Sequence, residues 1–344
     1  MKACVLHNIN DLRYEDVPMP EPASGQVLIK IKASGICGSD IQRVFEKGTY
    51  HFPTIPGHEF AGEIVDVASD VDSSLIGKKA AVFPLIPCRS CPSCQIGEYA
   101  QCSNYDYYGS RRDGGFAEYL AVDQFNLVIV PQEVSYEEAA MCEPTAVAIH
   151  ALSQADICFG DTIAIFGAGT IGLILAKIAR ASGASKVILI DIDDRKLEFA
   201  KKLGFEHVVN NANGDAISEI NKITGNKGSV VTLEGTGVPD VLEQCLKSTA
   251  AFGRVVLMGN PLRDMKISQK AYWEILRRQL TLKGTWNSSY NGFVNNWECA
   301  VNAMPKLGLK DLITHRYDLS QCNEAFDAMR SHKDLVLKAM FVLK

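Results

Sequence analysis

The stretch TIAIFGAGTIG, residues 162–172, decides the fold of this chain. It joins an apolar run, Thr162–Phe166, to the pattern G-x-G-x-x-G at Gly167, Gly169 and Gly172. Gly167 permits a tight turn, Gly169 lets the backbone approach a pyrophosphate, and Gly172 allows a helix to pack closely against the strand. The pyrophosphate would lie at the positive N-terminus of that helix. The stretch therefore predicts a strand, a dinucleotide-binding loop and a helix.

An acidic residue follows at the distance expected of a ribose ligand. Asp191 ends the next apolar run, about 20 residues beyond Gly172. Its carboxylate would accept hydrogen bonds from the adenosine ribose and repel a 2′-phosphate, so we expect NAD rather than NADP. Arg195 lies nearby and would soften that preference. A glycine-rich turn without a ligand is the alternative. The predicted cofactor-binding residues are Gly167, Gly169, Thr170, Ile171, Gly172, Asp191 and Arg195.

Strand-like and helical patterns alternate from residue 162 to about residue 285. Because the strands are apolar throughout, the alternation predicts a doubly wound parallel sheet with helices on both faces. Before residue 150, short β-type runs broken by Gly and Pro predict an antiparallel, partly closed sheet. We expect an α/β protein in which a Rossmann domain is inserted into a β-rich domain. The expected boundaries are 1–150, 151–285 and 286–344.

The composition excludes several classes of protein. Of the 344 residues, 47% are hydrophobic and 22% are charged, which is ordinary for a globular protein and argues against disorder. The net charge is −5 without a basic stripe, so nucleic acid is not an expected partner. The N-terminus lacks the apolar core of a signal peptide, and no run is apolar over the roughly 20 residues of a membrane span. We expect a cytoplasmic protein of about two domains that binds no membrane.

The chain has 11 cysteines, four of them clustered within residues 86–104. Disulfide frameworks are typical of small secreted chains, so metal binding explains this cluster better. Zinc prefers four thiolates at a closed, structural site. An iron–sulfur cluster would also take four cysteines, but the spacing differs from the ferredoxin patterns. The third alternative is four free thiols. The predicted structural ligands are Cys88, Cys91, Cys94 and Cys102.

Three other segments carry the residue types of a second metal site. They contain Cys37, His58 followed by Glu59, and Glu143. A cysteine, a histidine and a carboxylate make three zinc ligands, and an open fourth position is typical of a catalytic site. Each residue alone is a weak signal, because a lone cysteine is usually a small buried hydrophobe and a lone glutamate is usually solvated. Their combination with a dinucleotide-binding pattern favours a zinc-dependent oxidoreductase.

Together these motifs resemble those of the zinc-dependent medium-chain dehydrogenases, in which they occur in the same order. The resemblance implies a GroES-like catalytic domain with an inserted Rossmann domain. Within the family, polyol dehydrogenases have a glutamate where liver-type alcohol dehydrogenases have a second cysteine, and Glu143 matches the polyol group. The resemblance further implies NAD, two zinc ions per chain, and a homodimer or homotetramer.

The resemblance also assigns roles near the catalytic metal. It implies that the zinc ligands are Cys37, His58 and Glu143. Hydride would pass from a zinc alkoxide to the nicotinamide, and Ser39 would relay the released proton. Asp40 would hydrogen-bond to His58 and fix its tautomer, or would cap a helix that begins beside it. Glu59 would lie behind the ligands or serve as an alternate ligand.

Residues 43–47 and 105–119 most resemble the branch of the polyol group that oxidises galactitol 1-phosphate to tagatose 6-phosphate. A phosphorylated substrate needs cations, and guanidinium groups match phosphate geometry. The alternative for Arg111 and Arg112 is a solvated surface pair, and the alternative for Trp286 is ordinary packing at a domain junction. Sorbitol, butanediol or threonine oxidation is the enzymatic alternative, and a catalytically silent dinucleotide-binding regulator is the non-enzymatic one. The candidate substrate-binding residues are Arg43, Lys47, Arg111, Arg112, Trp286 and Asn287.

Overall fold

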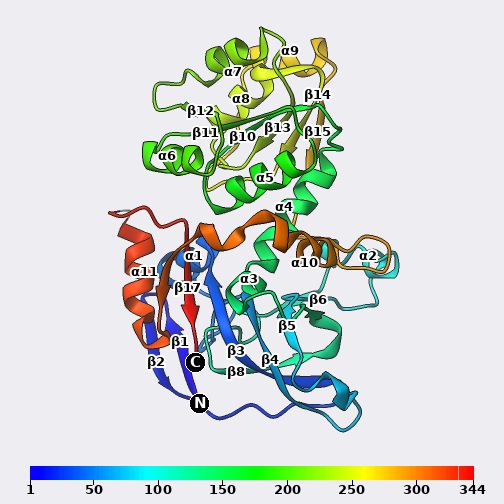
Figure 1. Ribbon diagram of the computed structural model, residues 1–344, viewed down its shortest axis with the longest axis vertical. Coiled ribbons are helices and arrows are strands. Elements are labelled where there is room, and N and C mark those ends of the chain that lie inside the picture. The colour runs from blue at the N-terminus through cyan, green and yellow to red at the C-terminus, as the bar shows by residue number, and fades with distance from the viewer. Residues whose placement is uncertain (332) are drawn as a thin grey trace. The chain divides into compact units, whose positions relative to one another are not determined.

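The computed structural model describes residues 1–331 and 333–344, and these form two compact units (Figure 1). The first unit is discontinuous and consists of Met1–Ala146 and Ser289–Lys344. The second unit is the intervening segment, Val147–Ser288. Among the described residues, no helix has the length and apolar character needed to cross a bilayer.

The second unit is built on a six-stranded parallel sheet with the order β12-β11-β10-β13-β14-β15. The chain order reverses between β10 and β13, which is the point where doubly wound sheets bind ligands. Helices α5 and α6 lie on one side of the sheet, and α7, α8 and α9 lie on the other (Figure 1). The strands are β10 (Thr162–Phe166), β11 (Lys186–Asp191), β12 (His207–Asn210), β13 (Ser229–Glu234), β14 (Thr249–Leu257) and β15 (Thr281–Gly284). The helices are α5 (Thr170–Ala181), α6 (Asp194–Lys202), α7 (Ala216–Thr224), α8 (Pro239–Ser248) and α9 (Gln269–Arg277).

The apolar run Thr162–Phe166 forms β10, a central strand of this sheet. Ile163, Ala164, Ile165 and Phe166 in β10 are each at most 1% exposed. A strand covered by helices on both faces has no solvent side, so its side chains need not alternate between apolar and polar. The predicted parallel doubly wound sheet is confirmed.

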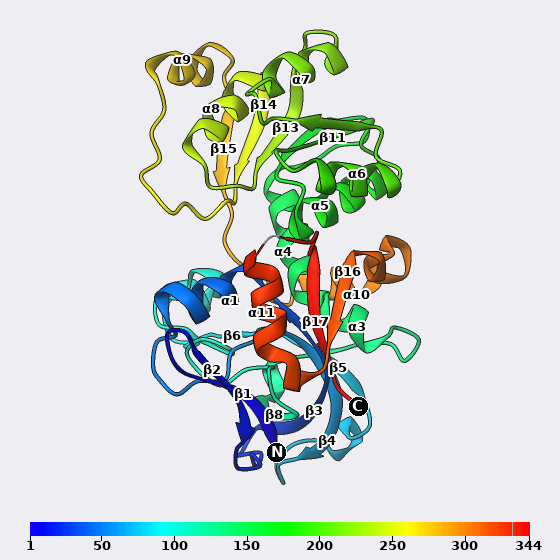
Figure 2. The same ribbon diagram turned by 90° about the vertical axis from the view of Figure 1, so that its left-hand side faces the viewer.

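The first unit contains a seven-stranded sheet with the order β16-β17-β3-β4-β5-β9, and β8 also pairs with β3. All of these pairs are antiparallel except that of β16 with β17. Two strands from the C-terminal part of the chain thus lie in a sheet begun by the N-terminal part (Figure 2). The strands are β3 (Gln26–Ile36), β4 (Glu59–Val67), β5 (Lys79–Val82), β8 (Tyr119–Asp123), β9 (Leu127–Ile129), β16 (Ile313–Tyr317) and β17 (Lys338–Val342).

Shorter elements complete the first unit, and two apolar clusters form its core on residues of β1, β3, β4 and α11 among others. The two-stranded pairs are β1 (Lys2–Asn8) with β2 (Asp11–Asp16), and β6 (Leu85–Ile86) with β7 (Asp106–Tyr107). The α-helices are α1 (Gly38–Gln42), α2 (Pro92–Gln95), α3 (Tyr136–Ala140), α10 (Asn296–Leu307) and α11 (Cys322–Ser331), and α4 (Cys142–Gln154) runs from the first unit into the second.

Candidate active site and metal centres

The glycine-rich loop between β10 and α5 shows why each glycine is needed. Gly167 has φ +107°, a backbone conformation that side chains disfavour. A Cβ on Gly172 would overlap the carbonyl oxygen of Gly167, so only glycine lets α5 pack this closely. A Cβ on Gly169 would meet no protein atom within 4 Å, which leaves the space beside this backbone unfilled by protein. Helix α5 begins at the next residue, Thr170, which is followed by Ile171, so its N-terminus adjoins that space.

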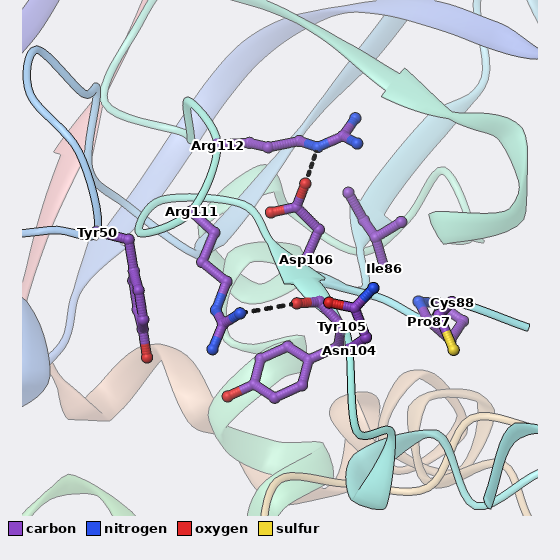
Figure 3. Close-up of a pocket in the computed structure, with 9 residues that line it drawn as sticks. All are labelled: Tyr50, Ile86, Pro87, Cys88, Asn104, Tyr105, Asp106, Arg111 and Arg112. Carbon is purple, nitrogen blue, oxygen red and sulfur yellow. Dashed lines mark hydrogen bonds and ion pairs between the residues drawn. The ribbon is translucent and has the colours of Figure 1, made fainter. Parts of the chain in front are cut away.

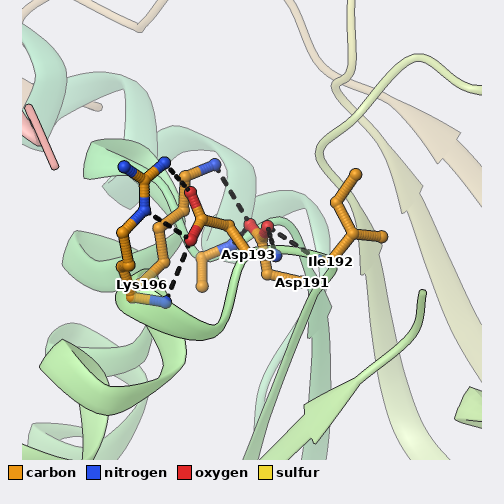
Figure 4. Close-up of polar contacts among 6 residues, drawn as sticks. Asp191, Ile192, Asp193 and Lys196 are labelled. Atoms are coloured by element: carbon orange, nitrogen blue, oxygen red, sulfur yellow. Dashed lines mark hydrogen bonds and ion pairs between the residues drawn. The ribbon is translucent and has the colours of Figure 1, made fainter. Parts of the chain in front are cut away.

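Asp191 holds the glycine loop as well as ending β11 (Figure 4). Its Oδ2 accepts a hydrogen bond from the backbone N–H of Ala168 at 2.8 Å, and its Oδ1 accepts from the N–H of Asp193 at 3.0 Å. Lys196 Nζ lies 3.4 Å from Oδ2. The guanidinium of Arg195 is paired with Asp193 at 2.7 Å. Lys196 was not among the predicted residues, although it lies in the first turn of α6, the helix that follows Asp191.

The four clustered cysteines converge. The sulfur atoms of Cys88, Cys91, Cys94 and Cys102 all lie within 4.8 Å of one another. Pro92 starts helix α2 directly after Cys91, and this turn directs two of the sulfur atoms to the same side. Backbone N–H groups of Cys94 and Ser103 lower the pKa of Cys91 to about 6, which favours its thiolate form. Four sulfur donors at this separation fit a tetrahedral zinc ion.

A second cluster forms where β3 ends and β4 begins. Strands β3 and β4 are antiparallel, with Gly35 opposite Glu59. This pairing places Cys37, just beyond β3, beside His58 and Glu59, and their ligand atoms all lie within 4.8 Å of one another. His58 is 4% exposed and Glu59 is 1% exposed. A thiol, an imidazole and a carboxylate are donors that zinc accepts, so the chemistry of this set fits the metal.

Asp40 lies directly behind this cluster and is fully buried. Its Oδ2 accepts a hydrogen bond from the N–H of Cys37 at 3.0 Å, and its Oδ1 lies 3.3 Å from Nδ1 of His58. Asp40 thus occupies the Nδ1 side of the ring, which leaves Nε2 for a metal. Burial disfavours the charged ring, but Asp40 and Cys37 together raise the pKa of His58 well above its usual value. The two roles expected for Asp40, helix capping and orientation of His58, are geometrically compatible.

Lys338 forms a buried ion pair with Glu59 at 2.5 Å and also donates to the carbonyl oxygen of Ile36 at 3.2 Å. It is 3% exposed and is the first residue of β17, the strand that pairs with β3. The absence of a side chain on Gly35 makes room for the Glu59 carboxylate, because a Cβ there would overlap Oε2. Lys338 was not among the predicted site residues, since nothing near it in the sequence indicates a site.

Glu143 lies outside the group of side chains whose ligand atoms converge within 4.8 Å, a group that holds Glu59 instead. It nevertheless shares the electrostatic environment of that group. Burial, reinforced by the carboxylates of Glu59 and Asp40, raises the pKa of Glu143 to about 7. The structure therefore offers two carboxylates near Cys37 and His58, where the sequence analysis expected Glu143 as ligand and Glu59 as its alternate.

Two of the basic candidates, Arg43 and Lys47, form hydrogen bonds with residues three to five positions away in the chain. Arg43 donates to Ser39 Oγ at 2.9 Å and to Asp40 Oδ1 at 3.0 Å. Its guanidinium therefore binds residues next to the cluster. Lys47 donates to Gln42 Oε1 at 3.1 Å on the surface.

Tyr107 also lies beside the cluster, although it was not among the predicted site residues. Its ring centroid lies 5.9 Å from that of His58.

The remaining candidates divide between the units. Arg111 and Arg112 line a pocket of the first unit (Figure 3). Trp286 and Asn287 follow β15 in the second unit, where Trp286 is 54% exposed and Asn287 has φ +54°.

Comparison with known families agrees with this architecture. Residues 23–132 match the alcohol dehydrogenase GroES-like domain, and residues 170–305 match the zinc-binding dehydrogenase domain. The chain belongs to the zinc-dependent medium-chain dehydrogenase family, which confirms the resemblance drawn from the motifs. It is an oxidoreductase of the alcohol and polyol type, and the family's cofactors are zinc and a nicotinamide dinucleotide.

The relatives of this chain are named for different substrates. Galactitol 1-phosphate 5-dehydrogenase of Escherichia coli strain K12 is 37% identical over 322 residues, 92% of each chain. Sorbitol dehydrogenase of Bacillus subtilis strain 168 is 34% identical over 345 residues, covering 99% of this chain and 96% of the relative. The crystal structure of galactitol-1-phosphate dehydrogenase from Escherichia coli superposes with a TM-score of 0.94 at 34% identity and covers all of both chains.

Proposed function

We propose that this enzyme oxidises a phosphorylated sugar alcohol, galactitol 1-phosphate, to the corresponding ketose phosphate, tagatose 6-phosphate, with NAD as the hydride acceptor. The observation that carries the proposal is the cluster of half-buried Cys37 with buried His58 and Glu59, with Asp40 behind the imidazole. The similarity to galactitol 1-phosphate 5-dehydrogenase over most of both chains supports the choice of substrate.

The chain's own residues hold and orient the reacting groups. Cys37 and His58, with Glu143 or Glu59, would bind the catalytic zinc, which acidifies a substrate hydroxyl when bound. Asp40 Oδ1 lies 3.3 Å from Nδ1 of His58 and would orient the ring from that side. Ser39 Oγ accepts a hydrogen bond from Arg43, and the Ser39 O–H would pass on the released proton.

The four clustered cysteines, Cys88, Cys91, Cys94 and Cys102, would hold a second, structural zinc ion, which makes two zinc ions per chain. The carboxylate of Asp191 supports NAD over NADP, because its negative charge disfavours a 2′-phosphate even with Lys196 beside it. We further propose a homodimer or homotetramer, as the family resemblance implies.

A substrate panel tests the proposal. The purified enzyme is supplied with zinc and with NAD or NADP, and NADH formation is followed for galactitol 1-phosphate, galactitol, sorbitol, butanediol and threonine. We expect the highest kcat/KM with galactitol 1-phosphate and NAD. A higher value with an unphosphorylated polyol or with threonine would overturn the phosphate assignment. Dinucleotide binding without turnover of any substrate would instead favour a silent regulator.

A further inference from the structure

We infer that Arg111 binds the phosphate of the substrate in a pocket of the first unit. One aromatic ring, that of Tyr107, lies between a wall of this pocket and the cluster of Cys37, His58 and Glu59. The inference deepens the proposed function and rests on it for the identity of the substrate. The pocket has a volume of about 440 Å³, which is within the range of small-molecule sites (Figure 3). Its lining residues are Tyr50, Ile86, Pro87, Cys88, Asn104, Tyr105, Asp106, Arg111 and Arg112.

The guanidinium of Arg111 is held in place before any ligand arrives. Its Cζ lies 4.1 Å from the ring centroid of Tyr50 and 4.4 Å from that of Tyr105. One of its terminal nitrogens donates to the backbone carbonyl of Tyr105 at 3.1 Å. Figure 3 shows the side chain between these two tyrosines. A guanidinium fixed in this way loses little conformational entropy when it binds an anion.

One N–H group of the Arg111 side chain lacks a hydrogen-bond acceptor among the described residues. Its Nε–H is buried and has no acceptor among the described residues, a situation that native proteins rarely leave unresolved. None of the ion pairs between described residues includes Arg111. A phosphate brings several acceptor oxygens and a negative charge, and planar guanidinium groups bind it through paired hydrogen bonds.

Two of the other basic candidates are already paired with carboxylates. Arg112 is paired with the carboxylate of Asp106 (Figure 3). Arg43 is bound to Asp40, behind the cluster of Cys37, His58 and Glu59. With Asp106 offset by Arg112, the charge of Arg111 remains available, so the pocket is suited to an anion.

Two ring contacts link this pocket to the cluster of Cys37, His58 and Glu59. The Tyr105 ring lies 6.2 Å from that of Tyr107, and the Tyr107 ring lies 5.9 Å from the ring of His58. All of these residues belong to the first unit. A sugar-alcohol phosphate is an extended chain with its phosphate at one end. Arg111 could therefore hold that end while a carbon further along the chain lies beside the metal.

The test compares Arg111→Ala, Arg111→Lys and Arg112→Ala in the zinc-loaded, full-length enzyme. Kinetics are measured with galactitol 1-phosphate and with galactitol, and inorganic phosphate is titrated calorimetrically. We expect Arg111→Ala to lower kcat/KM about 10- to 100-fold more for the phosphorylated substrate than for galactitol, because a hydrogen-bonded charge is lost. Arg111→Lys should recover part of this loss, and Arg112→Ala should affect both substrates alike. Phosphate binding should disappear in Arg111→Ala, weaken in Arg111→Lys and persist in Arg112→Ala.

Several outcomes separate this inference from the proposed function. An equal effect of Arg111→Ala on both substrates, with phosphate binding intact, would overturn the role of Arg111 alone. A wild-type enzyme without preference for the phosphorylated polyol, but with phosphate binding that depends on Arg111, would uphold the pocket and refute the proposed substrate. Absence of both the preference and phosphate binding would overturn both. The calorimetric titration and the lysine variant keep the test valid if the alanine variant folds poorly.

Discussion

Replacing Lys338 by Met would leave the carboxylate of Glu59 buried without its cation. The two side chains are 3% and 1% exposed, and their charged atoms lie 2.5 Å apart. Removing one partner of a buried ion pair costs about 3–5 kcal/mol, because the remaining charge keeps its desolvation penalty. Met matches the length of the lysine stem, so the change in packing is small. We expect Lys338→Met to lower the free energy of unfolding of the first unit by about 3–5 kcal/mol.

Urea unfolding of the protein after chelation of its metal, followed by circular dichroism, measures the effect, because a zinc ion beside Glu59 would itself compensate the carboxylate. With a slope of about 1–3 kcal/mol per molar urea, the loss should move the midpoint by about 1 M or more. The matched control is Lys2→Met, which breaks a 2.7 Å pair with Asp16 on the surface of the same unit. Exposed pairs contribute about 0–1 kcal/mol, so that midpoint should hardly change.

A double substitution checks the physical cause. Glu59→Gln removes the charge that Lys338→Met leaves unpaired, so the combined variant should be more stable than Lys338→Met alone. The reasoning is refuted if Lys338→Met costs no more than Lys2→Met, or if Glu59→Gln brings no recovery. Either result would mean that water or another group compensates the carboxylate.

Three further changes have defined outcomes. Gly172→Ala should weaken NADH binding at least about 10-fold and destabilise its unit by about 1–3 kcal/mol, because the new Cβ overlaps the loop backbone; unchanged affinity in a fluorescence titration would contradict this. Cys94→Ser should remove one zinc per chain, as measured by atomic emission, and lower the melting temperature, whereas retention of both metals would show that the four sulfur atoms are not one site. Asp191→Asn should raise the ratio of kcat/KM for NADP to that for NAD about 10-fold, since the repelling charge is lost, and a constant ratio would place discrimination elsewhere.

The sequence by itself determined the features that depend on neighbours along the chain. The run Thr162–Phe166 and the glycines after it specify a buried strand, a tight turn and a helix start, because each requirement acts within a few residues. The convergence of Cys88–Cys102 is likewise local, since short spacings and one proline turn the sulfur atoms toward each other. The doubly wound sheet follows from the order of apolar strands and helices.

Only the tertiary structure decided which distant side chains meet. Lys338 lies beside Glu59 because β17 pairs with β3, a contact between opposite ends of the chain that no local pattern encodes. The same holds for the arginine candidates, which look alike in sequence. Asp106 neutralises Arg112, while two tyrosines fix Arg111 and leave its charge unpaired. Short-range sterics and hydrogen bonding act through sequence spacing, whereas charge pairing and burial depend on the completed fold.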